Sequence, residues 1–187
     1  LPAEVVRGAM LVRANTLARG CSGVRLEVVE TLLEMLNRGV TPVVPSQGSL
    51  GSSGDLGPLS HMALVWTTDH LDCEEDSGWA EYGGVVMTGK AAMAAAGIPR
   101  IILGPKEGLA VNNGATFTAA MAALAVWEAH YLVRLADVAL AMSLEAMLGC
   151  ASAFDARLHA ARNQVGQIAV AANVLEVIKG SSLINQS

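Results

Sequence analysis

The sequence has few charged and few aromatic residues, and it contains no spacing typical of a metal site. Charged residues make up 16% of its 187 residues and aromatic residues 4%. The net charge is −5, with no basic stripe, so nucleic acid is not expected as a partner. The four histidines form no H-x-x-x-H pair and the cysteines no C-x-x-C pair, so we expect no bound metal.

Long uninterrupted apolar segments are also absent. The longest apolar run begins at Ala115 but meets Glu128, which makes it shorter than the ~20 residues that a membrane-spanning helix needs. A membrane protein is therefore not expected. The three cysteines, Cys21, Cys73 and Cys150, are odd in number and widely spaced. This usage predicts reduced thiols in a cytoplasmic protein.

Apolar residues, in contrast, are plentiful. Hydrophobic residues make up 52% of the chain, and the mean hydropathy is +0.44. A small domain has a high ratio of surface to volume, so it cannot hide this much apolar surface alone. Since the membrane interpretation fails, the composition predicts an oligomer with large apolar interfaces.

Almost every strong periodic signal in the sequence is helical. We expect helices at residues 2–17, 25–37, 58–69, 88–96, 115–148 and 164–179, and a short extended piece at 100–103. The helix at 115–148 is apolar on nearly all faces, which predicts a buried core helix that forms the spine of a bundle. Residues 70–84 are polar and acidic, so we expect an exposed loop there.

The segment 39–58 is rich in glycine and proline and cannot form regular structure. One interpretation is an ordinary Gly-Ser loop in which Asp55 caps the following helix. However, its prolines make it stiffer than a flexible linker, and it contains the tripeptide Ser52-Ser53-Gly54.

This tripeptide has the residue types that a self-cyclisation requires. The amide nitrogen of Gly54 can attack the carbonyl carbon of Ser52 and close a five-membered ring. Loss of two waters, one of them from the Ser53 hydroxyl, then gives a methylidene-imidazolone, which is an electrophile. Gly54 lacks a Cβ, so its nitrogen can approach, and a tight turn would hold the atoms in attack geometry.

The segment contains Gly48-Ser49-Leu50-Gly51, Ser53-Gly54-Asp55-Leu56 and Pro58-Leu59. These residues resemble the signature of the histidine, phenylalanine and tyrosine ammonia-lyase family, which includes aminomutases. Further matches lie at Arg13-Ala14-Asn15, Ser22-Gly23-Val24-Arg25, Gly104 to Ala110 and Asn113-Gly114, so that the resemblance covers about residues 1–180. Two departures are Ser52, where the family usually has Ala, and Asn112, where it has an aliphatic residue.

The resemblance implies a mainly α fold, a long-helix bundle of the aspartase/fumarase-like (histidine ammonia-lyase) type with a Gly/Pro-rich active-site loop. It implies an ammonia-lyase that eliminates ammonia from an aromatic L-amino acid through 4-methylidene-imidazol-5-one formed from Ser52, Ser53 and Gly54, without metal or nucleotide. Asn113 would be catalytic, Leu109 and Asn112 would line the substrate pocket, and Asp55 and Leu56 would support the loop. A homotetramer is implied as well.

The family's base Tyr, a second Tyr and a carboxylate-binding Arg have no counterparts in this sequence. We therefore expect residues 1–187 to be the single central portion of a larger lyase chain. Alternatives are a 2,3-aminomutase, a non-catalytic helical member in which Ser52 prevents ring formation, and a serine hydrolase using Ser53, Asp55 and His61. Asn112-Asn113-Gly114 could also be only a helix C-terminal turn. His61 is expected to be packed or hydrogen-bonded, and Arg13 and Arg25 to form ion pairs.

Overall fold

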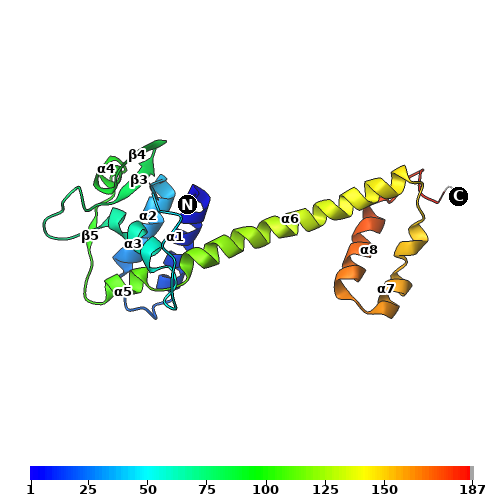
Figure 1. The fold of residues 1–187 in the computed structure, drawn as a ribbon, viewed down its shortest axis with the longest axis horizontal. Coiled ribbons are helices and arrows are strands. Elements are labelled where there is room, and N and C mark those ends of the chain that lie inside the picture. The colour runs from blue at the N-terminus through cyan, green and yellow to red at the C-terminus, as the bar shows by residue number, and fades with distance from the viewer. Residues whose placement is uncertain (186–187) are drawn as a thin grey trace. The chain divides into compact units, whose positions relative to one another are not determined.

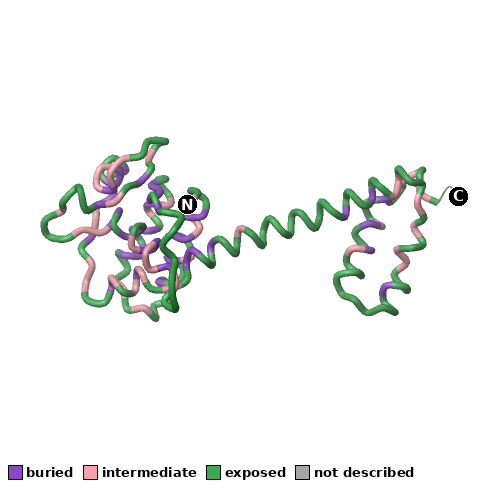
Figure 2. Tube along the Cα trace, viewed as in Figure 1, coloured by how far each residue is buried: buried purple, intermediate pink, exposed green. Residues whose placement is uncertain are grey.

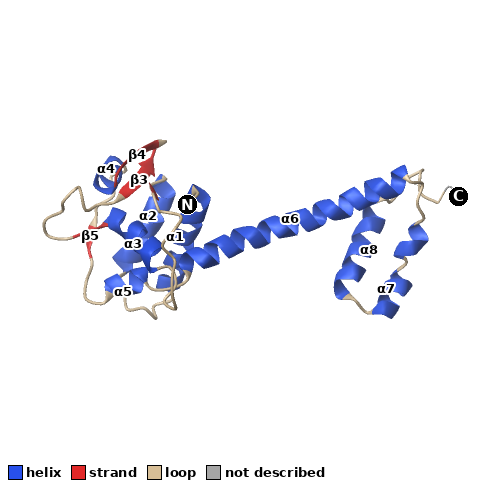
Figure 3. Ribbon diagram, viewed as in Figure 1, coloured by secondary structure: helices blue, strands red, loops and turns tan. Residues whose placement is uncertain are grey.

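The computed structural model describes residues 1–185 and is mainly helical (Figure 3). Its residues cluster into two compact units, Leu1–Leu124 and Ala125–Ser187. The first unit contains the glycine-rich loop and all the motifs, from Arg13 to Gly114, that resemble the lyase family. It also contains most of the buried apolar residues (Figure 2).

Two helices open the first unit and pack on each other (Figure 1). Helix α1 spans Ala3–Ala18 and helix α2 spans Leu26–Arg38, which confirms the predicted helices at 2–17 and 25–37. Helix α2 ends at Gly39 with φ of 79°, a left-handed conformation that glycine adopts without steric cost. Their facing sides are closely packed and apolar, including Val6, Met10, Leu17, Val28, Leu32 and Met35.

The glycine-rich segment runs from the short strand β1 (Thr41–Pro42) to helix α3 (Leu56–Trp66). Helix α3 begins earlier and ends sooner than the predicted range 58–69. Pro58 lies in its first turn, where a missing N–H costs no helical hydrogen bond. Strand β2 (Thr67–Thr68) follows at once and pairs in parallel with β5 (Ile101–Ile102), which confirms the extended piece expected at 100–103.

The predicted loop at residues 70–84 is wrong in its second half, because a β-hairpin begins there. Strands β3 (Trp79–Tyr82) and β4 (Val85–Thr88) pair antiparallel, and β1 extends the sheet in the order β1-β3-β4. Gly83 and Gly84 form the connection with φ of 59° and 80°. Two consecutive positive φ values suit the tight turn that matches strand twist, and a Gly-Gly pair signals it. Helix α4 (Gly89–Ala95) follows, close to the predicted range 88–96.

Two further helices complete the first unit. Helix α5 spans Glu107–Asn112 and contacts α3. Helix α6 spans Thr116–Ala146, close to the predicted range 115–148, and its first residues belong to this unit. Phe117 and Ala120 are buried in the same apolar core as α1 to α4.

The second unit consists of the remainder of α6, a 3-10 turn (Ala151–Phe154), helix α7 (Ala156–Arg162) and helix α8 (Val165–Val177). Helix α8 confirms the prediction at 164–179, whereas α7 was not predicted. Within this unit Asn173 donates a hydrogen bond of 2.7 Å to the carboxylate of Asp137. No helix of the described residues is long and apolar enough to cross a membrane.

The prediction that α6 is buried on all faces is wrong for the single chain. Trp127 is 70% exposed and Leu132 61% exposed. Other large apolar side chains of this helix are also exposed, namely Val126, Tyr131, Val133, Leu135 and Met142. An apolar pattern indicates that a surface is suited to being covered, but it does not indicate which chain covers it.

Candidate active site

The tripeptide Ser52-Ser53-Gly54 lies in a tight turn. The amide of Gly54 donates a hydrogen bond of 3.3 Å to the carbonyl oxygen of Gly51, so the chain reverses across the two serines. Gly51 and Gly54 both have φ of 84°, which is strained for residues with a side chain. Both serines are exposed. The residues present fit the ring expected from the sequence, because the tripeptide lies in a tight turn and Gly54, whose nitrogen would attack, has no side chain to block its approach.

A second glycine, Gly114, packs against this turn. Gly54 and Gly114 form an isolated parallel β-bridge, and the Asp55 amide donates to the Gly114 carbonyl at 3.0 Å. A Cβ added to Gly54 would lie 3.0 Å from that carbonyl oxygen and 3.1 Å from the nitrogen of Ala115. A larger residue at position 54 would therefore push the turn away from the backbone it rests on.

The carboxylate of Asp55 is fully buried and joins three segments. Its Oδ1 accepts hydrogen bonds from the Ser49 hydroxyl at 2.6 Å and the Thr118 hydroxyl at 3.1 Å, and its Oδ2 accepts from the Thr118 amide at 2.9 Å. Burial alone raises the pKa of Asp55. The hydrogen bonds from Ser49, Thr118 and the Phe117 amide outweigh burial, so the pKa lies below its ordinary value.

These contacts argue against the interpretation of Asp55 as a simple helix cap. Asp55 does occupy the N-cap position of α3, but its side chain accepts no hydrogen bond from that helix. It reaches instead to the start of α6, 63 residues away in sequence. Leu56 is half-buried at the first position of α3. Its neighbour Gly57 allows the loop to lie close to α3, since a Cβ there would be only 2.9 Å from the Gly48 carbonyl oxygen.

Helix α5 carries the second group of residues that were singled out from the sequence. Leu109 is 56% exposed, and Asn112 is half-buried with its amide 3.4 Å from the Ser60 hydroxyl on α3. The Oδ1 atom of Asn112 is buried and has no hydrogen-bond partner. Asn113 does not share the helical face, because its backbone is extended just past the end of α5. It therefore also forms the helix terminus that the alternative interpretation expected.

The start of α5 is fixed by a buried carboxylate that the sequence did not reveal. Glu107 is 2% exposed and accepts hydrogen bonds from the Arg25 side chain at 2.8 to 3.2 Å, from the Arg25 amide at 2.8 Å and from the Gly104 amide at 2.6 Å. The pKa of Glu107 is lowered from 4.5 to about 2, and the hydrogen bonds from the Arg25 guanidinium are the largest cause. The ion pair expected for Arg25 is therefore confirmed. Position 107 belongs to the matched block 104–110, which is the one sequence signal that could have identified it.

Arg13 does not form the ion pair expected for it among the described residues. Its Nη2 donates to the backbone carbonyl of Asn113 at 2.8 Å. Ser49 and Thr118, the partners of Asp55, were likewise not assigned a role from the sequence. Ser49 lies inside the matched motif, whereas nothing in the sequence marks Thr118.

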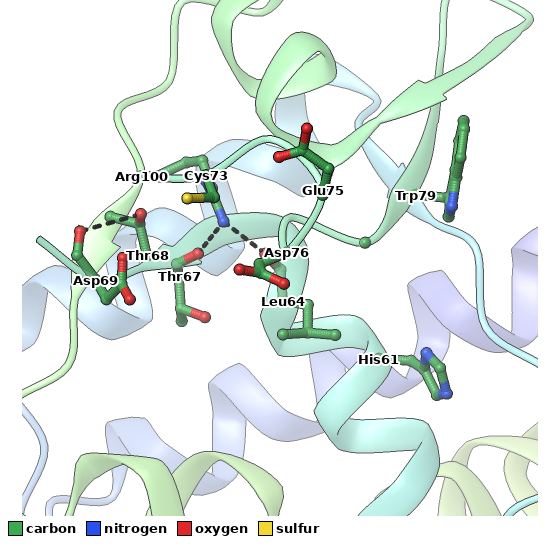
Figure 4. Close-up of a pocket in the computed structure, with 11 residues that line it drawn as sticks. His61, Leu64, Thr67, Thr68, Asp69, Cys73, Glu75, Asp76, Trp79 and Arg100 are labelled. Atoms are coloured by element: carbon green, nitrogen blue, oxygen red, sulfur yellow. Dashed lines mark hydrogen bonds between the residues drawn. The ribbon is translucent and has the colours of Figure 1, made fainter. Parts of the chain in front are cut away.

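The serine hydrolase alternative finds no support in the geometry. His61 is exposed, and no hydrogen bond joins it to Ser53 or Asp55 in the part of the chain that the structure describes, so the expectation that it is packed is also wrong. His61 lines a separate pocket at the end of α3 (Figure 4). There Arg100 donates to the carbonyls of Leu64 and Thr67 and forms an ion pair with Asp72 at 2.6 Å. Asp72 is therefore not simply a solvated acid of the exposed loop expected at 70–84.

Residues 1–185 contain neither a metal-binding cluster nor a pair of bonded cysteines. No three His, Cys, Asp or Glu side chains come close enough together to hold a metal ion. The three cysteines are unpaired and exposed.

We predict that Glu107→Gln makes the protein less stable at neutral pH by about 2 kcal/mol, because the charge-assisted hydrogen bonds that the buried carboxylate accepts from Arg25 and Gly104 are weakened. The Glu107 pKa is lower in the folded protein than in the unfolded chain. Its stabilisation is therefore present above pH 4.5 and is lost as the pH falls toward about 2. The melting temperatures of the wild type and the variant should converge over this range.

The matched control is Glu30→Gln, which removes an exposed carboxylate of α2 that has no ion pair among the described residues. Its melting temperature should follow that of the wild type at every pH. A constant difference between Glu107→Gln and the wild type from pH 7 down to pH 2 would contradict the role given to Glu107.

Comparison with known proteins agrees with these features. The family model described as aromatic amino acid lyase matches residues 1–187. The chain is 48% identical over 186 residues to a histidine ammonia-lyase of Alkaliphilus metalliredigens, covering 100% of this chain and 35% of that protein. It is 52% identical over 181 residues to a histidine ammonia-lyase of Gloeobacter violaceus, covering 97% and 34%.

Solved structures of the same family are also similar to this chain. A phenylalanine ammonia-lyase from Rhodosporidium toruloides matches with a TM-score of 0.86 and 40% identity, covering 98% of this chain and 28% of that one. The phenylalanine aminomutase of Pantoea agglomerans matches with a TM-score of 0.84 and 33% identity, covering 96% and 33%. The chain spans about a third of the length of the curated relatives it matches. By its family model, its sequence relatives and its fold, the chain belongs to the aromatic amino acid lyase family.

Proposed function

We propose that the protein containing these residues is an ammonia-lyase whose electrophile forms from Ser52, Ser53 and Gly54. The observation that carries this proposal is the turn at Gly51–Gly54, held against Gly114 by the backbone amide of Asp55, whose carboxylate binds Ser49 and Thr118. The Gly54 nitrogen forms a bond to the Ser52 carbonyl carbon. The carbonyl oxygen then leaves as water with the hydrogens of the Gly54 and Ser53 amides, and a double bond remains between that carbon and the Ser53 nitrogen. Ser53 then loses its hydroxyl and its α-hydrogen as a second water.

The ring, once formed, supplies an electrophilic methylidene carbon to which the substrate adds. Asn113 would orient the ring or the substrate carboxylate. Its side chain is exposed and makes no hydrogen bond to any described residue, so its amide is free to bind another group. Leu109 and Asn112 would contact the substrate side chain, since both lie on α5, which packs on the helix that follows the ring-forming turn. The catalytic base and the Arg that binds the carboxylate would come from other parts of the full protein.

The proposed substrate is an aromatic L-amino acid, with histidine as the first candidate. Two observations support histidine. The curated relatives described above are histidine ammonia-lyases at 48% and 52% identity. Position 112 also carries a carboxamide with an unpartnered oxygen, which suits a polar ring better than a purely apolar one.

A 2,3-aminomutase is the second candidate. It is favoured by the structural similarity to a phenylalanine aminomutase at 33% identity and to a tyrosine aminomutase from Streptomyces globisporus at 35%. Such an enzyme would return the amine to the β-carbon instead of releasing it.

The proposed assembly is a homotetramer. The exposed apolar side chains of α6 support it, because a single chain leaves them in water at a cost of roughly 25 cal/mol for each Å² of apolar surface. Copies of the same chain would cover one another's long helices.

We predict that the intact mass of the full protein lies below the sequence mass by two water molecules, and that the ring adds near-ultraviolet absorbance. Ser53→Ala should lose at most one water relative to its own sequence mass and should have no turnover, because the hydroxyl that leaves as the second water is absent. Ser52→Ala should keep the deficit, since closure uses only the backbone carbonyl of that residue. Ser46→Ala, in the same exposed loop, is the matched control and should behave as the wild type. A wild-type protein at its unmodified mass would favour the non-catalytic alternative.

Substrate choice is tested with a panel of histidine, phenylalanine and tyrosine, followed for both the unsaturated acid and the β-amino acid. We expect the unsaturated acid from histidine to form fastest, with kcat/KM at least about tenfold above the other two, the factor that 1.4 kcal/mol of selective binding provides. Accumulation of β-amino acid as the main product would show an aminomutase instead.

The tetramer is tested by sedimentation of the full protein. Trp127→Asp should shift the main species from a tetramer to smaller forms, because it places a charge in an apolar interface. Leu71→Asp changes a similarly exposed apolar residue in a loop of the first unit and should leave the tetramer intact. A wild-type protein that sediments as a monomer at micromolar concentration would refute the assembly.

A further inference from the structure

We infer that Arg13 is a positioning residue that orients Asn113 toward the ring-forming turn by holding its backbone carbonyl. This inference rests on the proposed function, because it assigns Arg13 a role in the same site. Arg13 is 3% exposed on α1, and its Nη2 lies 2.8 Å from the Asn113 carbonyl oxygen, 100 residues away in sequence.

The segment Asn113–Gly114 is held from two sides. On one side Arg13 binds the carbonyl of Asn113, and a Cβ on Gly114 would lie 3.2 Å from its Nη2 atom. On the other side the amide of Asp55 binds the carbonyl of Gly114, next to the bridge between Gly54 and Gly114. Two successive carbonyls are thus fixed by different partners. The peptide plane between Asn113 and Gly114 has little freedom to rotate, and the direction of the Asn113 side chain depends on it.

Asn113 depends on this contact for a further reason. Its side chain has no hydrogen bond to any described residue, and its backbone is extended, so neither a partner nor helical packing fixes it. Its backbone amide donates a hydrogen bond to the Leu109 carbonyl, and its backbone carbonyl accepts one from Arg13. A shift of about 1 Å in a group that contacts the reacting atoms can cost about a hundredfold in rate. Arg13 therefore acts through Asn113 without touching the substrate.

A purely structural arginine fits this position less well. The Nε atom of Arg13 is buried without a partner, and burial lowers the pKa of its guanidinium, an effect that Asp55 offsets only in part. An unsatisfied buried donor is costly, whereas an apolar side chain of similar length would avoid that cost. The contact made by Nη2 gives a reason for a guanidinium here.

The test is a double-mutant cycle in the full-length protein with Arg13→Met, Asn113→Ala and the double variant. Arg13→Met alone should lower kcat by about 10- to 100-fold, the effect of losing one charge-assisted hydrogen bond. In the Asn113→Ala background it should lower kcat by less than about twofold, because the residue through which Arg13 acts is gone. An equal loss in both backgrounds would overturn the inference. Arg13→Lys, which keeps a donor and a charge, should recover part of kcat.

Arg7→Met is the matched control. Arg7 also lies on α1, is half-buried, and donates from Nη2 to a backbone carbonyl, that of Leu36 at 3.1 Å. It should lower the melting temperature by a similar amount and leave kcat within about twofold of the wild type. A loss of kcat equal to that of Arg13→Met would overturn the inference, because the effect would then not be specific to the contact with Asn113.

Amide hydrogen exchange separates this inference from the proposed function, since it needs no turnover. Arg13→Met, or Arg13→Lys if the first variant does not fold, should speed exchange at the Asp55 amide by about tenfold, because its acceptor Gly114 is no longer held. Arg7→Met should not. Unchanged exchange at Asp55 overturns the positioning role even in an active enzyme. Faster exchange in a protein without ring or turnover supports it and rejects the proposed function alone.

Discussion

The buried carboxylate of Asp55 is the interaction on which the candidate site depends. It binds the loop at Ser49 and the start of α6 at Thr118, while its own amide binds the Gly114 carbonyl. A carboxylate removed from water is stable only when its oxygens are well satisfied, and here Ser49 and the start of α6 supply the donors. Because the residue also follows Gly54 directly, these bonds determine where the turn at Gly51–Gly54 lies. The turn is therefore positioned by polar contacts with distant segments rather than by apolar packing of its own exposed serines.

Polar contacts between distant segments also position the residues around the turn. Glu107 fixes the start of α5 through Arg25 and Gly104, and Arg13 fixes the residue just beyond its end. Together these contacts join α1, the loop before α2, α5 and α6, while the apolar core of the first unit provides the rigid support behind them. Glycine is required where two backbones meet, because Gly54 and Gly114 leave no room for a side chain between the turn and the extended segment. The arrangement places the exposed hydroxyl groups of Ser52 and Ser53 and the side-chain amide of Asn113 on segments that these contacts join.

Much of this was predictable from the sequence because the signals are local. Helical periodicity predicted α1, α2, α4 and α8. The long motif indicated the family and the loop in which the ring is expected to form. The contacts that build the site were not predictable, since Asp55 to Thr118 and Arg13 to Asn113 join residues far apart in sequence. The hairpin at 79–88 was missed although Gly83-Gly84 signals its turn, because the acidic residues before it suggested a loop. The burial of α6 was predicted wrongly because its pattern measures apolar surface and does not reveal which chain covers it.

The central claim is that the polar contacts of Asp55 hold Ser52, Ser53 and Gly54 in a turn that closes into a ring. A crystal structure of the full-length protein at near-atomic resolution tests this most directly, because electron density distinguishes a planar five-membered ring from an open peptide. We expect continuous ring density across residues 52–54, with the Asp55 amide still bonded to the Gly114 carbonyl. Density for two intact serine side chains in an open peptide, or a closed ring with Asp55 detached from Gly114 and Thr118, would contradict it.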